Sequence, residues 1–85
     1  RPETCAEVVV KVQNLLREIE QKKYSGVANT DKSAIARDAL NTIKNDEKFK
    51  KQVIDTYKKL GFSHFKMFVN HPAVDLIIDD LKKLM

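Results

Sequence analysis

Gly26, Gly61 and Pro72 divide the chain into segments that share one pattern. Within each segment apolar residues recur at spacings of three and four, which is the period of an amphipathic helix. The 85 residues contain only two Gly and two Pro. An all-β domain of this size needs many turns, and turns use Gly and Pro. The pattern therefore predicts an all-α protein.

The first expected helix opens with "RPETCAEVVVKV". Pro2 suits a first helical turn, and Thr4 and Glu7 have the spacing of a capping box. Ser25 and Gly26 offer a stop. Its apolar stripe covers four turns and consists of Cys5, Val8, Val9, Val12, Leu15, Leu16 and Ile19.

Two further helices are expected over residues 31–44 and 46–60. Asn29 or Thr30 is suited to cap the first of them, and Asn45 or Asp46 the second. Gly61 is expected to end the second one. Their apolar faces consist of Ile35, Ala39, Leu40 and Ile43 in the first, and of Phe49, Val53, Ile54, Tyr57 and Leu60 in the second.

The stretch "KKLGFSHFKMFVNHPAV" from Lys58 to Val74 holds three of the four Phe residues. After Gly61 we expect a short helix with Phe65, Phe68 and Val69 facing the core. Phe62 and Met67 lie off that face, so both are expected to be at least partly exposed.

A last helix is expected after "NHP". The residue before a proline disfavours the helical conformation, so we expect His71 at the helix cap and Pro72 at the first helical position. The inward face consists of Val74, Ile77, Ile78, Leu81 and Leu84 or Met85.

Taken together, these elements predict a compact orthogonal bundle of four helices plus one short connector helix, forming a single domain over residues 1–85. Short loops make neighbouring helices pack antiparallel or at steep angles. A single coiled coil is excluded because Gly26, Gly61 and Pro72 interrupt the pattern.

Charge and cysteine content limit the possible classes. Sixteen Lys and Arg against twelve Asp and Glu give a net charge of +4, and only three of the cations are Arg. A mild lysine excess favours solubility more than nucleic-acid binding. The single cysteine excludes a disulfide scaffold. No apolar run approaches the length of a membrane span. The chain begins with Arg, which fits a processed chain or a domain of a longer protein, and the compartment is left open.

No pattern points to catalysis, a cofactor or a metal. His64 and His71 are seven residues apart, whereas helical zinc ligands are typically four apart. The adjacent acids Asp79 and Asp80 point about 100° apart on a helix, so they do not form an acid–base pair. The two Gly are 35 residues apart, which excludes a glycine-rich phosphate loop. We therefore expect that the protein is not an enzyme.

The expected function is a non-catalytic module that presents an apolar groove to a protein or peptide partner. The groove is expected between residues 62–68 and the last helix, because half-exposed Phe and Met beside a short helix are typical of such sites. Lysines are expected at its rim. The predicted partner-binding residues are Tyr57, Lys58, Lys59, Phe62, Lys66 and Met67.

Two alternatives stay open. The runs "NTIKNDEKFKKQV" and "HPAVDLIIDDL" resemble the helical repeats of insect midgut microvillar and cockroach allergen proteins, a resemblance that covers under half the chain. It implies a small carrier of an apolar ligand or lipid. The other alternative is a weakly basic nucleic-acid-binding domain, in which Lys58, Lys59 and Lys66 surround stacking Phe side chains. Acidic residues at the start of the third expected helix oppose phosphate contact.

Overall fold

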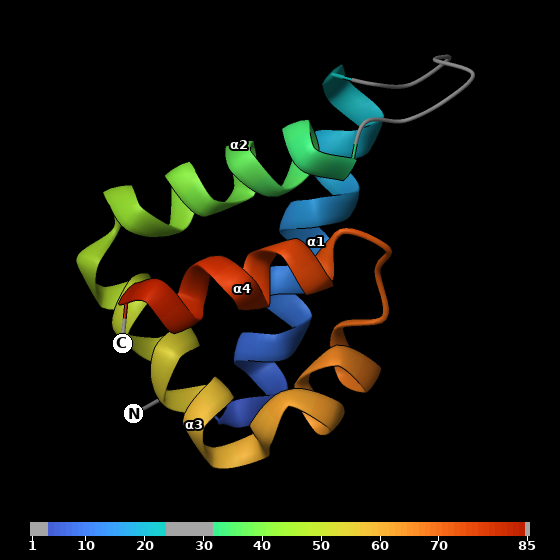
Figure 1. Ribbon diagram of the computed structural model, residues 1–85. Helices are drawn as coiled ribbons and strands as arrows, with labels where there is room; N and C mark the ends of the chain where they lie inside the picture. Colours follow the sequence, from blue (N-terminus) through green and yellow to red (C-terminus); the bar gives the residue numbers. More distant parts are fainter. Residues whose placement is uncertain (1–3, 24–31, 85) are drawn as a thin grey trace.

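The computed structural model describes residues 4–23 and 32–84 (Figure 1). These residues form four helices and no strand, which confirms the predicted all-α bundle. The helices are α1 (Cys5–Lys23), α2 (Lys32–Asn45), α3 (Glu47–Val69) and α4 (Val74–Leu84). The radius of gyration is 12.3 Å, close to the value of about 12 Å for a compact chain of this length.

The helix pair with the most extensive contact, α1 and α3, skips one helix in the sequence. α1 packs on α3, and α2 packs on α4, with further contacts between consecutive helices. Figure 1 shows α2 and α4 side by side, while α1 crosses behind them at a steep angle. This arrangement is the orthogonal one that short loops and several amphipathic helices favour.

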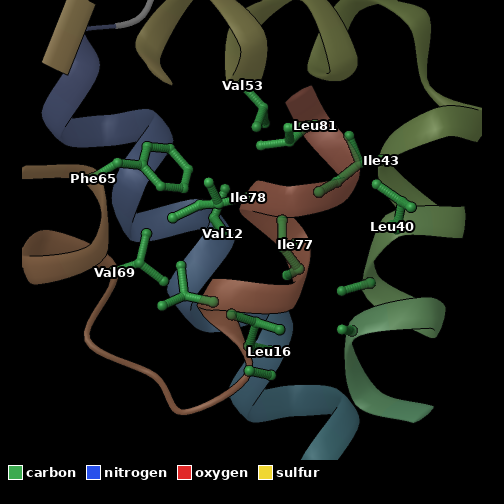
Figure 2. Packing of buried hydrophobic residues seen from close by; sticks show 14 of the residues in the cluster. Val12, Leu16, Leu40, Ile43, Val53, Phe65, Val69, Ile77, Ile78 and Leu81 are labelled. Carbon is green, nitrogen blue, oxygen red and sulfur yellow. The ribbon is translucent and has the colours of Figure 1, made fainter. Parts of the chain in front are cut away.

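The core is built from the predicted apolar faces. Val12, Leu16, Ile43, Val53 and Ile77 have no exposed surface. Figure 2 shows their side chains converging from all four helices, together with Phe65, Val69, Ile78 and Leu81. The helical spacing of the apolar residues therefore predicted most of the buried side chains, with an exception after Gly61.

Side chains accept free backbone amides at the starts of α1 and α3, and a residue in the left-handed conformation ends α3. Thr4 Oγ1 accepts the amide of Glu7 at 3.2 Å, and Asp46 Oδ1 accepts the amide of Phe49 at 3.1 Å. Of the two caps expected for α3, the structure uses Asp46. Asn70 ends α3 with φ 50° and ψ 54°, a conformation that Asn tolerates better than most residues.

The expected stop at Ser25–Gly26 and the expected caps Asn29 and Thr30 lie outside the described residues.

Gly61 bends α3 instead of ending it. Its φ of 80° and ψ of 173° fall in a region that is open almost only to glycine. The predicted connector helix is therefore the second part of α3, residues 62–69, and Figure 1 shows the bend where α3 passes from yellow to orange.

Two expectations for the segment after the bend are wrong. Phe68 is 48% exposed instead of buried. Phe65 and Val69 already fill the narrow stripe of this short segment that meets the core, and Phe68 falls beside it. The last helix begins at Val74 and not at Pro72. His71, Pro72 and Ala73 form a turn in which the amide of Val74 donates to the carbonyl oxygen of His71 at 3.1 Å.

His71 was expected at the cap of the last helix, but its buried side chain caps the turn that precedes α4 instead. Its Nδ1 accepts the amide of Ala73 at 3.0 Å. Its side chain lies against α1, where Nε2 is 3.4 Å from Glu20 Oε2.

Candidate functional site

Among the described residues, four large apolar side chains are exposed. They are Val10, Phe62, Met67 and Phe68, at 51%, 42%, 59% and 48%. The expectation that Phe62 and Met67 are at least partly exposed is confirmed. Successive helical residues are rotated by about 100°, so Phe62 and Phe68 lie on opposite sides of the buried Phe65, and Met67 points away from it. These side chains therefore do not make one surface.

An apolar hollow lies between the first turns of α1 and the bend of α3. Its volume is about 370 Å³. Val9 forms its buried floor, while Val10 and Phe68 stand half exposed at its sides. We call it the α1–α3 hollow, and its lining residues are Cys5, Ala6, Val9, Val10, Leu60 and Phe68.

The local sequence explains why this hollow is apolar. Val8, Val9 and Val10 are consecutive, so only part of the run faces the core. Val8 and Val9 are buried, and Val10 is turned toward solvent. On the other side, the bend at Gly61 separates Leu60 from the following segment, which brings Phe68 toward α1. The hollow thus depends on an apolar residue outside the helix stripe and on a glycine bend.

The side of residues 62–69 that faces α4 is different. The Nζ atoms of Lys66 and Lys82 lie 5.9 Å and 5.3 Å from the centroid of the Phe62 ring. Lys66 also pairs with Asp75 at 3.3 Å. Cations at these distances are attracted to an aromatic face. The groove was expected on this side, but here the half-exposed Phe62 is flanked by lysine side chains, and the apolar hollow lies on the α1 side.

The predicted partner-binding residues fall into separate places. Tyr57 is only 8% exposed and packs edge to face against Phe65, so it belongs to the core. Phe62 and Lys66 are brought together near α4. Lys58, Lys59 and Met67 are exposed, and among the described residues neither of these two lysines forms an ion pair.

The sequence pattern did not mark Val10, Val9 or Leu60 as site residues, and it predicted Phe68 in the core. One signal was available. Val10 lies outside the stripe formed by Val8, Val9 and Val12, and an apolar residue outside a buried stripe is a candidate for a contact surface. The pairing of this residue with Phe68 depends on the bend and has no local sequence signal.

Chemically reactive groups are scattered. Cys5 is half buried at the edge of the hollow. In the described part of the chain, no group of three His, Cys, Asp or Glu is placed to hold a metal ion. His64 is exposed, and its ring lies 6.1 Å from that of Phe68.

Over residues 4–23 and 32–84, no helix has the length and apolar character needed to cross a bilayer. No family model, curated protein or solved structure matches the chain, so the resemblance of residues 41–53 and 71–81 to allergen repeats gains no support.

Proposed function

We propose that this protein is a non-catalytic helical binding module that takes apolar side chains of a protein or peptide partner into the α1–α3 hollow. One observation carries the proposal. Val10 and Phe68 are 51% and 48% exposed and stand at the sides of an apolar hollow of about 370 Å³. Exposed apolar surface that is concave and shared by two helices is typical of helix and peptide recognition.

The shape of the hollow favours an anchored side chain over an enclosed ligand. A carrier that uses the bundle interior needs space inside the core, and the core positions Val12, Leu16 and Ile77 are filled by packed, fully buried side chains. A carrier remains the second candidate for one reason: about 370 Å³ lies within the range of about 300–1,000 Å³ that is typical of small-ligand pockets.

A selection from a library of random displayed peptides tests the proposal without a known partner. The full chain is the bait, and enriched peptides are then titrated against the double variant Val10→Ser, Phe68→Ser. We expect binding to weaken more than tenfold, because both anchors of the apolar contact are removed. Peptides that bind this variant as well as they bind the parent chain would overturn the proposal.

The matched control is Phe62→Ser with Met67→Ser, which changes two similarly exposed apolar residues outside the hollow. This pair is also the competing surface predicted from the sequence. A larger loss in this variant than in the hollow variant would assign binding to the surface around Phe62, Lys66 and Met67.

The only cysteine gives an independent readout. Cys5 lines the hollow, so a peptide seated there should slow the reaction of its thiol with a maleimide. Unchanged thiol reactivity in the presence of saturating peptide would place the peptide elsewhere.

A further inference from the structure

The face of α1 that borders the hollow carries a cation, Arg17, further along the helix. Ala6, Val10, Gln13 and Arg17 follow each other at spacings of four, three and four, so they lie along one face of α1. Ala6, Val10 and Arg17 are exposed, and Gln13 is half exposed. Arg17 is seven residues beyond Val10, which is two helical turns, or about 10 Å along the axis.

Arg17 has no counter-ion in the described part of the chain. No carboxylate there lies within ion-pair distance of its guanidinium. Glu20 follows Arg17 by three residues on α1, and its Oε2 lies 3.4 Å from His71 Nε2. An arginine is suited to binding a carboxylate through two parallel hydrogen bonds, which a lysine cannot reproduce.

Resting on the proposed function, we infer that the partner of the α1–α3 hollow is an acidic amphipathic helix that places an apolar side chain between Val10 and Phe68 and a carboxylate on Arg17. The spacing supports this partner. A partner helix that lies along α1 has the same rise per residue as α1. Two of its side chains about seven residues apart, one apolar and one Asp or Glu, can therefore contact Val10 and Arg17 at the same time. The net charge of +4 also favours an acidic partner during encounter.

Peptides selected on the full chain, and shown to need Val10 and Phe68, provide the probe. We expect most of them to carry an Asp or Glu six to eight residues from their apolar anchor. Arg17→Gln should then weaken their binding about tenfold. Lys51→Gln is the matched control, because Lys51 is an exposed cation on α3 with no ion pair among the described residues, and it should change the affinity less than twofold.

A double-mutant cycle identifies the contact. When the peptide's carboxylate is changed to the amide, Arg17→Gln should have no further effect, because the pair is already broken. Arg17 is exposed, so its replacement should leave the melting temperature unchanged.

The possible failures are distinct. Hollow-dependent peptides without enriched acids, or equal losses in Arg17→Gln and Lys51→Gln, would overturn the inference and leave the proposed function standing. Selected peptides that ignore Val10 and Phe68 would overturn both. A concentration-dependent dimer that Val10→Ser abolishes would make the occupant a second copy of this chain and would also overturn the inference.

Discussion

Tyr57 and Phe65 lie on either side of the bend at Gly61, and their rings meet edge to face with centroids 5.7 Å apart. In a straight helix these residues would be about 12 Å apart along the axis. The bend therefore lets two parts of α3 pack on each other, and both rings end in the core.

Gly61→Ala should destabilise the protein by about 1–3 kcal/mol. An added Cβ meets no atom within 4 Å, so the cost comes from the backbone at φ 80° and not from a clash. Chemical denaturation measures the loss. A D-alanine at the same position, introduced by chemical synthesis, favours positive φ and should keep most of the stability. If Gly61→Ala were as stable as the parent, the bend would not be a constraint of the fold.

Leu16→Ala should lower the free energy of unfolding by about 2–5 kcal/mol, because Leu16 is fully buried on α1. Its neighbour Leu15 is only partly buried and gives a matched comparison, with a smaller expected loss from Leu15→Ala. Urea melts of the two variants check the difference. Equal losses would mean that the inward face of α1 is assigned wrongly.

The two histidines should hold opposite neutral tautomers. His71 Nδ1 accepts the amide of Ala73, so the proton must be on Nε2. His64 Nδ1 lies 3.2 Å from the carbonyl oxygen of Leu60, which can only accept, so there the proton must be on Nδ1. Nitrogen-15 NMR of the neutral rings distinguishes the two forms. The Nδ1–H tautomer at His71 would contradict its capping role.

Metal removal should leave the fold unchanged. The motivating observation is that His64 is exposed while His71 is buried against Glu20, so their rings do not converge on one ion. Thermal melts with and without a strong chelator should coincide. A chelator-induced drop of several degrees would show that a metal stabilises the fold.

Substitution of Tyr57 should lower stability more than substitution of the other residues predicted to bind a partner. Tyr57→Ala removes a buried ring and should cost about 3–5 kcal/mol, whereas Met67→Ser changes an exposed side chain and should cost less than about 0.5 kcal/mol. Phe62→Ser also loses its contacts with Lys66 and Lys82, so we expect up to about 1 kcal/mol. Denaturant midpoints of the three variants would establish the order of the stability losses. A loss from Tyr57→Ala as small as that from Met67→Ser would mean that Tyr57 is not a core residue.

Helix periodicity predicted the fold well because the buried faces are strongly marked. The stripe through Val8, Val12 and Leu16 was assigned correctly, and Asp46 was one of the two caps expected for α3. Periodicity gives the direction of a face but not its width or its partner. Phe68 lies only about 60° from Phe65, yet one is half exposed and the other fully buried.

The hollow was missed for a related reason. Val10 comes from α1 and Phe68 from beyond the bend in α3, 58 positions later in the chain. Nothing local to either residue specifies the other. The glycine that makes their approach possible was recognised as a helix breaker, but the sequence does not say whether a breaker ends a helix or turns it.

Because α1 packs on α3 and α2 packs on α4, the core depends on contacts between helices that are not consecutive in the chain. Cutting the chain between any two consecutive helices separates at least one of these pairs, so no consecutive-helix hairpin contains its own complete apolar interface. In a fragment made of α1 and α2 alone, the apolar face of α1 that packs on α3 and the apolar face of α2 that packs on α4 would be exposed to water. The chain should accordingly fold in one cooperative step, and limited proteolysis should give either the intact bundle or small peptides, with no stable half surviving.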